Sequence, residues 1–304
     1  MPGARVVLPA DDATHTRAPW EWWYWTGHLR TATDRWFGFE LVFFRRFHGS
    51  RPAQVTHAAI TDIAGGRFHH GSDHRFAPRM PGHDGFRLDA GPWRAQGCDG
   101  QDLLHVEVDG WSLELRLRST RPVVLHHDDG YTDYAVGGYT FYYSRPRMEA
   151  AGTLQRGGEH HDVAGAAWFD HQWGDLGTMV GAGWDWLGIQ LDDGRDVMLF
   201  MMGASHGRRL VGATITDAQG RGRTLNAQDC ALEPTGWWTS PSTGRCYPSG
   251  WHLRVEALRL EVTPVLLDQE VRAANMVYWE GAAVVTGDAR GRAYVELTAN
   301  QDCP

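Results

Sequence analysis

Apolar and polar residues alternate along most of the chain. A period of two, with Val, Leu, Phe and Trp at the apolar positions, is typical of β-strands that bury one face. The alternation is clearest at 36–45, 103–117, 197–202, 251–262 and 293–298. Turn formers such as Asp109-Gly110 lie between these segments at the short spacing of antiparallel hairpins. Helical periodicity is nearly absent, so we predict an all-β chain whose helical pieces are short, as at 267–274.

Two parts of the chain share a pattern. The segments at 23–27 and 184–188 both read W-x-W-x-G, and each precedes a turn and a second apolar strand. Tyr142-Tyr143 precedes a hairpin in the first half, as Tyr278-Trp279 does in the second. Two related β units explain both echoes. We therefore predict two domains, at residues 1–176 and 177–304.

Composition excludes one class of partner. The net charge is -8, with 37 Asp and Glu against 29 Lys and Arg, and no basic run is longer than Arg208-Arg209. A nucleic-acid binder needs a surface that neutralises phosphates, so nucleic acid is not an expected partner. The 15 tryptophans stand out instead. Large aromatic side chains fill cores and also make walls for apolar ligands, so this number favours a pocket for a hydrophobic molecule.

The cysteines and the amino terminus bear on the compartment. Cys98, Cys230, Cys246 and Cys303 have no C-x-x-C spacing, so we expect neither a structural zinc site nor a disulfide framework. The apolar run at 6–8 is too short for a secretory signal, and no stretch approaches the length of a membrane helix. These features predict a cytoplasmic protein without a membrane span.

Longer motifs carry a family resemblance. The first half has E-W-W-Y-W-T-G-H-L at 21–29, Y-Y-S at 142–144 and A-W-F-D-H-Q-W-G at 167–174. The second half has G-W-D-W at 183–186, Q-L-D-D-G-R at 190–195, Y-W-E-G at 278–281 and Y-V-E-L-T at 294–298. Together, from residue 20 to 298, they resemble the AttH/CrtC-type lipocalin-like family.

The resemblance implies a fold and a range of chemistries. The fold would be two lipocalin-like antiparallel β-barrel or sandwich domains packed side by side, with ligand in or between them. Relatives include carotenoid 1,2-hydratases, a fungal hydratase of a plant phytoalexin, and fungal lipocalin-like enzymes that close polyenes by Diels–Alder reaction. The chain resembles the AttH branch more than the carotenoid hydratases, and its ending L-T-A-N at 297–300 departs from the usual Gly-Tyr. A carotenoid substrate is therefore not the expectation.

Asp170 is the leading candidate for catalysis. It lies between Trp168, Phe169 and Trp173 in the sequence, and burial among such rings raises the pKa of a carboxyl group. A carboxyl that stays protonated can supply the proton that water addition to an isolated alkene needs. The alternative is that Asp170 and His171 hydrogen-bond the backbone at the domain junction and are purely structural.

Other carboxyls and rings complete the candidate site. Glu21 and Glu280 are flanked by tryptophan, so each is either a functional group with a shifted pKa or a strand-end residue that points outward. The predicted catalytic residues are Asp170, His171 and Glu21. Aromatic faces stabilise a developing carbocation by about 0.5–2 kcal/mol per contact. The predicted substrate-binding residues are Trp25, Tyr142, Trp168, Trp173, Trp184, Trp186, Tyr278, Trp279 and Glu280.

Several other chemistries are not expected. The histidine clusters at 69–74, 126–129 and 159–162 lack H-E-x-x-H spacing, so we interpret them as polar hairpin ends and predict no metal site. No G-x-S-x-G elbow is present, and no glycine-rich loop stands in the context that a nucleotide site needs. We predict no cofactor.

The sequence thus predicts a cofactor-independent enzyme of natural-product biosynthesis. It would bind an apolar polyene, isoprenoid-like or polyketide molecule in an aromatic pocket and promote hydration or cyclisation of C=C bonds. Two alternatives stay open: a Diels–Alder pericyclase that acts by positioning, and a non-catalytic carrier of a hydrophobic ligand. The expected partner is an apolar small molecule, with weak association with membranes or lipids left open.

Overall fold

The chain folds into β-strands throughout. The computed structural model describes residues 5–48, 51–77, 85–134, 138–176, 183–202, 209–274 and 276–298. Apart from the 3-10 turns Ala10–Asp12 and Ala227–Asp229, all the regular structure in these residues is β, which confirms the predicted class. The helical piece predicted at 267–274 is wrong. Glu270–Arg272 forms strand β22, because the edge of strand β23 (Val277–Gly287) offers it backbone partners.

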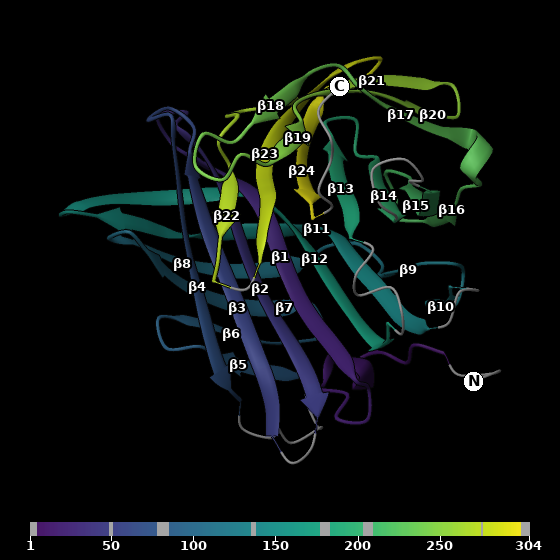
Figure 1. Cartoon of the computed structure of the whole chain (residues 1–304), viewed down its shortest axis with the longest axis horizontal. Helices are drawn as coiled ribbons and strands as arrows, with labels where there is room; N and C mark the ends of the chain where they lie inside the picture. The colour runs from purple at the N-terminus through teal and green to yellow at the C-terminus, as the bar shows by residue number, and fades with distance from the viewer. Residues whose placement is uncertain are drawn as a thin grey trace.

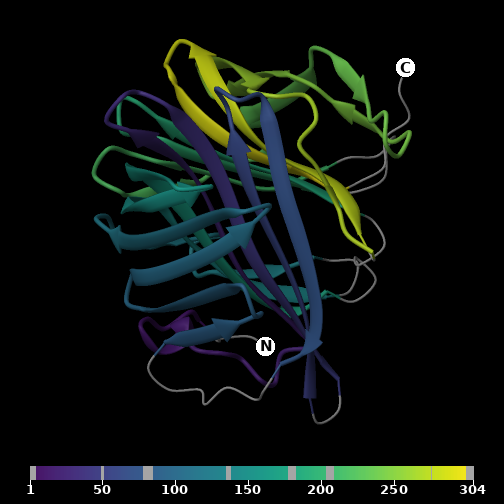
Figure 2. The same cartoon turned by 90° about the vertical axis from the view of Figure 1, so that its left-hand side faces the viewer.

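The first domain is one curled antiparallel sheet. Its strands are β1 (Trp20–Thr31), β2 (Trp36–His48), β3 (Arg51–Asp62), β4 (Arg67–Phe76), β5 (Phe86–Asp89), β6 (Trp93–Cys98), β7 (Gln101–Val108), β8 (Trp111–Ser119), β9 (Val124–Leu125), β10 (Tyr131–Asp133), β11 (Tyr139–Arg156) and β12 (Glu159–Asp175). They follow the order β4-β3-β2-β1-β12-β11-β8-β7-β6-β5, with β9 and β10 on β11. The sheet curls until β7 contacts β3 and β4, which forms a half-barrel (Figure 2).

The second domain repeats this plan with shorter strands. They are β13 (Trp184–Leu191), β14 (Asp196–Met202), β15 (Arg209–Thr216), β16 (Gly222–Thr224), β17 (Cys230–Pro234), β20 (Trp251–Val255), β21 (Leu258–Pro264), β22, β23 and β24 (Gly291–Leu297), with a separate hairpin of β18 (Trp237–Thr239) and β19 (Cys246–Pro248). In each sheet the first strand pairs with the second strand and with the last, β1 with β2 and β12, and β13 with β14 and β24. The two W-x-W-x-G segments therefore occupy the same place in the two sheets.

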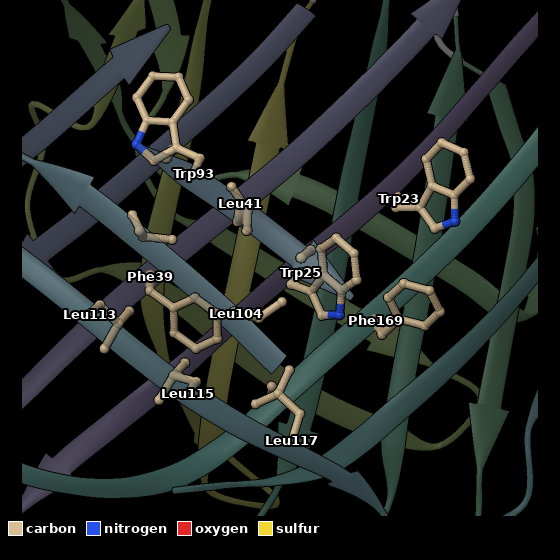
Figure 3. Close-up of a cluster of buried hydrophobic side chains, with 14 of the residues drawn as sticks. Trp23, Trp25, Phe39, Leu41, Trp93, Leu104, Leu113, Leu115, Leu117 and Phe169 are labelled. Atoms are coloured by element: carbon tan, nitrogen blue, oxygen red, sulfur yellow. The ribbon is translucent and has the colours of Figure 1, made fainter. Parts of the chain in front are cut away.

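Each sheet encloses its own apolar core. The inner face of the first sheet carries Trp23, Trp25 and Phe169, which pack with leucines of β7 and β8 (Figure 3). The inner face of the second sheet carries Leu187, Trp251 and Trp279. The two lipocalin-like domains predicted from the sequence are thus confirmed. Both clusters consist of buried apolar side chains, so the inner faces contribute to stability.

The outer faces of the two sheets pack against each other. Tyr24 and Trp168 of the first domain form a third buried cluster with Trp186 and Tyr294 of the second. Figure 1 shows the second domain, in green and yellow, seated on strands β1, β11 and β12. The predicted domain boundary between 176 and 177 borders the segment 177–182, which lies outside the described residues. It stays a prediction.

Two further findings concern the cysteines and the helices. Cys246 is disulfide-bonded, so the expectation of a chain without disulfides is wrong at this position. The sequence could not reveal this bond, because cysteine pairing depends on which strands the fold brings together. Among the described residues, no helix has the length and apolar character needed to cross a membrane.

Candidate functional site

Strand alternation divides the W-F-D-H-Q-W motif between two environments. On β12, Phe169, His171 and Trp173 point into the first domain and join its core or the polar group at the core's end. Trp168 and Asp170 point the opposite way, toward the second domain. Since successive side chains of a strand face opposite sides, the neighbours Asp170 and His171 cannot act at one centre.

A small pocket lies where the outer faces meet. Its volume is about 50 Å³. The lining residues, drawn from both domains, are Trp22, Tyr24, Phe44, Tyr142, Asp170, Gln172, Leu176, Trp184, Trp186, Phe200, Met202 and Glu296. Pockets at domain interfaces with aromatic walls and a few polar groups are typical ligand sites. A cavity of this size is far below the roughly 300–1,000 Å³ of typical ligand pockets and does not hold a whole polyene.

Asp170 is the most densely hydrogen-bonded group in the pocket. Its Oδ2 accepts from the Tyr142 hydroxyl at 2.7 Å, and its Oδ1 accepts from Trp168 Nε1 at 2.6 Å and from the Ser144 hydroxyl. Trp186 Nε1, from the second domain, donates to the Tyr142 hydroxyl at 3.1 Å. The carboxyl group is therefore held in one orientation by side chains of both domains.

A polar chain runs from Asp170 to the second domain. Ser144 Oγ lies 2.7 Å from His126 Nε2, and His126 Nδ1 lies 2.9 Å from Thr214 Oγ1 on β15. The interpretation of the 126–129 cluster as a polar hairpin end is wrong for His126, which is buried at the domain interface. A serine hydroxyl both donates and accepts, so Ser144 can donate to an ionised Asp170 or accept from a protonated one.

Burial sets the protonation of this chain. Desolvation raises the pKa of Asp170 to about 7, against the lowering effect of the hydrogen bonds from Ser144, Tyr142 and Trp168. Desolvation also lowers the pKa of His126 to about 3. His126 is therefore neutral near pH 7 and able to exchange a hydrogen bond with Ser144, while Asp170 is poised between its acid and base forms.

A second carboxyl group faces the same pocket from the other domain. Glu296 Oε2 accepts from Trp184 Nε1 at 2.8 Å, and burial raises the pKa of Glu296 to about 7. Sequence reasoning missed Glu296, Tyr24, His126 and Ser144. The signal for Glu296 was present, since alternation in Y-V-E-L-T places a glutamate opposite the apolar positions of a buried strand.

The structure brings five of the predicted binding and catalytic residues together and places the others elsewhere. Asp170, Tyr142, Trp168, Trp184 and Trp186 surround the pocket. Trp25, Trp173 and Trp279 lie in the domain cores. Glu280 lies just behind the pocket wall, where its Oε1 accepts a hydrogen bond from the Tyr24 hydroxyl at 2.7 Å. The Tyr278 hydroxyl is hydrogen-bonded to His57 Nδ1 at 2.9 Å.

Glu21 and His171 form a separate group at the end of the first domain. Among the described residues, His15, Glu21 and His171 are the one set whose ligand atoms are close enough to share a metal ion, within 4.8 Å of one another. They already satisfy each other: Glu21 Oε1 lies 2.8 Å from His15 Nδ1 and 3.0 Å from His171 Nε2. We interpret the group as a hydrogen-bonded clasp that ties the amino-terminal segment to β1 and β12.

A larger groove elsewhere between the domains has a different character. It has a volume of about 850 Å³, is open, and is lined in part by Arg30, Trp36, Asp162 and Arg292. The Arg292 guanidinium lies 3.3 Å from the centre of the Trp36 ring. None of the described residues that line this groove is a buried acid comparable with Asp170, so we assign the candidate site to the smaller pocket.

Comparison with known proteins agrees with this architecture. The family model described as AttH-like matches residues 1–300. The solved structure of an AttH protein from Nitrosomonas europaea has a TM-score of 0.89 and 29% sequence identity, over 99% of this chain and 98% of that one.

Two more distant structures share the fold alone. Kievitone hydratase from Nectria haematococca has a TM-score of 0.77 and 14% identity, over 98% of this chain and 94% of that one. CghA, solved with Sch210972, has a TM-score of 0.55 and 12% identity, over 93% of this chain and 89% of that one. No curated protein sequence matches the chain.

Proposed function

Since the chain belongs to the AttH-like family, we propose that it is a cofactor-independent enzyme that protonates a carbon–carbon double bond of an apolar small molecule. The outcome is hydration or cyclisation, with Asp170 as the acid. The observation that carries the proposal is a buried carboxyl with a pKa of about 7 at the wall of an aromatic pocket between the domains. That the fold is shared with a hydratase supports the same class of reaction.

The chemistry follows from the contacts of Asp170. The protonated carboxyl gives its proton to one alkene carbon, and the C=C π electrons form the new C–H bond. The positive charge left on the other carbon is stabilised by the surrounding rings. In hydration, water adds to that carbon and returns a proton to the carboxylate, so the acid is regenerated. In cyclisation, a second double bond attacks the cation and a later C–H loss returns the proton.

The polar chain behind Asp170 suits this cycle. While Asp170 is protonated, the Ser144 hydroxyl can accept from it and donate to neutral His126. After proton transfer, the same hydroxyl turns and donates to the carboxylate, together with Tyr142 and Trp168. Both states of the acid are therefore hydrogen-bonded without movement of the backbone, which is the preorganisation that acid catalysis needs.

The substrate we propose has a compact, branched unsaturated end. An isoprenoid end group would enter the pocket, whose volume of about 50 Å³ has to widen to take it, while the remainder of the molecule would extend out of the pocket. A Diels–Alder pericyclase needs no proton donor and has to enclose both reacting partners, so this small acidic pocket favours acid catalysis over that alternative. A carrier likewise has no use for a poised acid.

The test is product analysis with a matched pair of variants. The wild type is incubated in ¹⁸O-labelled water with prenylated phenols and acyclic isoprenoids, and products are analysed by mass spectrometry. We expect ¹⁸O incorporation or a cyclic isomer, and a loss of at least about 100-fold in rate for Asp170→Asn, because general acid catalysis contributes that much. The rate should also fall as pH rises above about 7, where Asp170 is ionised.

Asp102→Asn is the control. Asp102 is equally buried and its pKa is also raised to about 7, but it lies in the core of the first domain, where it accepts from Trp25 Nε1 at 3.0 Å. Its variant should keep the activity. If Asp170→Asn converts the substrate as fast as the wild type, acid catalysis by Asp170 is ruled out and the pericyclase alternative is favoured. If the wild type returns every compound unchanged, the carrier alternative is favoured.

A further inference from the structure

The pocket combines aromatic walls with an excess of acidic over basic groups. Asp170 enters from the first domain and Glu296 from the second. Six of its lining residues are Trp, Tyr or Phe besides Tyr142, and none of the lining residues that the structure describes is Lys or Arg. An apolar guest needs the rings alone, so the second carboxyl calls for a separate explanation.

More acid lies directly behind the wall. Glu280 and Glu296 are opposite each other on β23 and β24, and Glu40 on β2 faces them from the first domain. Glu280 and Glu40 are fully buried. Within the described part of the chain, Glu280 Oε2 and both Glu40 carboxyl oxygens have no hydrogen-bond partner. Burial and the neighbouring acids raise the pKa of both groups well above the ordinary carboxyl value, so both are protonated and neutral near pH 7. They therefore supply Glu296 with no positive counter-charge from behind the wall.

We propose that the pocket is a binding site for a compact organic cation of the alkylammonium class, with Glu296 as the principal counter-charge and Asp170 as the second. Aromatic faces attract cations through their ring quadrupoles, most strongly when both partners are desolvated, and quaternary and tertiary ammonium groups are typical guests of such cages. The inference deepens the proposed function, because the carbocation formed by alkene protonation carries the same charge in the same place.

The occupant also determines the protonation of the two acids. Asp170 faces Tyr142 and Ser144 on β11 and Trp168 on β12. Glu296 faces Trp184 on β13, Glu280 on β23, Glu40 on β2 and Tyr24 on β1. No cationic group of the described residues is hydrogen-bonded to either acid. A bound cation would favour the ionised carboxylates, so binding should release protons and tighten with rising pH.

The experiment compares two probes of one shape. N,N-dimethyl-3-methylbut-2-enylammonium is the charged probe, and 2,5-dimethylhex-2-ene is its neutral isostere. Dissociation constants are measured on the full chain by quenching of tryptophan fluorescence at about pH 8 and about pH 5.5, a range in which the amine stays protonated. We expect the cation to bind at least about tenfold more tightly than the alkene at the higher pH, and this preference to fall at the lower pH.

Two variants locate the charge and the rings. Glu296→Gln should reduce the preference for the cation by about tenfold and leave the affinity for the alkene unchanged. Glu149→Gln, at an exposed glutamate paired with Arg118, should change neither. If Glu296→Gln does not fold, Trp22→Leu takes its place. It removes a partly exposed ring of the pocket wall and should weaken binding of the ammonium probe more than binding of the alkene.

The outcomes separate this proposal from the proposed function. Three results would overturn the cation site, even in an active hydratase. They are equal binding of the two probes at the higher pH, binding of neither probe, and a preference for the cation that Glu296→Gln leaves unchanged. A strong preference for the ammonium probe, in a protein that converts no alkene, would support the cation site and count against the catalytic proposal.

Discussion

Three buried aspartates show how neighbours set the charge of one side-chain type. Desolvation raises the pKa of Asp170 and of Asp102 to about 7, because hydrogen bonds from neutral donors compensate only in part. At Asp12, desolvation also acts to raise the pKa, but Arg145 and the Tyr143 hydroxyl outweigh it and the net pKa is lowered. At Asp12, the full positive charge in contact and the hydrogen bonds together reverse the effect of burial.

The Asp12–Arg145 pair gives a prediction at this scale. Arg145 Nη1 and Nη2 donate to the two oxygens of Asp12 at 2.9 and 3.1 Å, and both residues are buried. Asp12→Ala leaves the guanidinium buried without its counter-charge, so we expect a loss of about 3–5 kcal/mol in the free energy of unfolding. Urea denaturation followed by circular dichroism measures it.

An exposed pair is the matched control. Arg195 forms a similar two-point contact with Asp193 in a surface turn. Asp193→Ala should change the free energy of unfolding by less than about 1 kcal/mol, because solvent already screens that pair. Equal losses in the two variants would contradict the assignment of Asp12 as a buried anchor.

At the scale of the element, tryptophan and glycine act as a unit within a strand. Gly188 follows Trp186 on the same face of β13, and a Cβ at Gly188 would overlap the Trp186 ring and press on Trp168. Gly281 has the same relation to Trp279 on β23. At these two positions the glycine leaves room for the indole along the strand, which explains the W-x-G spacing there more directly than a ligand does. Gly27 differs, because a Cβ there would meet Phe39 and the backbone of β12 instead of the Trp25 ring.

Gly188→Ala should therefore disturb the pocket as well as the fold. The displaced Trp186 ring would lose its hydrogen bond to the Tyr142 hydroxyl, which in turn positions Asp170. We expect a loss of about 1–3 kcal/mol in stability from overpacking, together with weaker quenching by the ammonium probe. Gly281→Ala should lose comparable stability yet bind the probe normally, since Trp279 lies in the core of the second domain. Identical probe binding by both variants would count against the packing argument.

Period-two patterning made the strands predictable, and the aromatic neighbours of Asp170 singled it out as a candidate, but neither could say which outer face would be covered. The tryptophans at 168 and 173 flank Asp170 in sequence, yet only Trp168 shares its face. We grouped His171 with Asp170 because the two are adjacent in sequence, and Glu21 because tryptophans flank it. Both lie instead on the inner face. Glu296 and His126 meet Asp170 through packing of distant strands, which no local pattern contains.

At the scale of the whole molecule, the interface between the two domains contains buried carboxyl groups that stay protonated. Burial raises the pKa of Glu40, Glu280 and Glu296 on the packed outer faces, in addition to that of Asp170. Exposed in the unfolded chain, these carboxyls would release their protons at lower pH. Between their unfolded and folded pKa values, the folded molecule binds more protons, so its stability falls as pH rises.

The clasp and the Asp12–Arg145 pair give stability the opposite dependence on pH. Burial acts to raise the pKa of Glu21, but hydrogen bonds and charge from His15 and His171 lower it overall. The stabilisation from Glu21 and Asp12 is present above the unfolded pKa of a carboxyl, about 4, and is lost as pH falls below it. Three buried histidines, His28, His57 and His126, have a pKa lowered to about 3 and act against the interface carboxyls below the unfolded histidine pKa of about 6.5. Stability should therefore change little between about pH 5 and pH 6.5 and fall above that range.

Urea denaturation from about pH 4 to pH 8 tests this whole-molecule prediction. The free energy of unfolding should fall by a few kcal/mol between about pH 5 and pH 8, since one unit of pKa shift corresponds to about 1.4 kcal/mol. Glu40→Gln replaces a fully buried carboxyl by a neutral amide of the same shape. It should be more stable than the wild type at pH 8, lose that advantage at pH 5, and so flatten the profile. Glu149→Gln, exposed on the first domain, should follow the wild type. A wild-type stability that rises from pH 5 to pH 8, or parallel profiles for Glu40→Gln and the wild type, would mean that the interface carboxyls are ionised and paired in the folded protein.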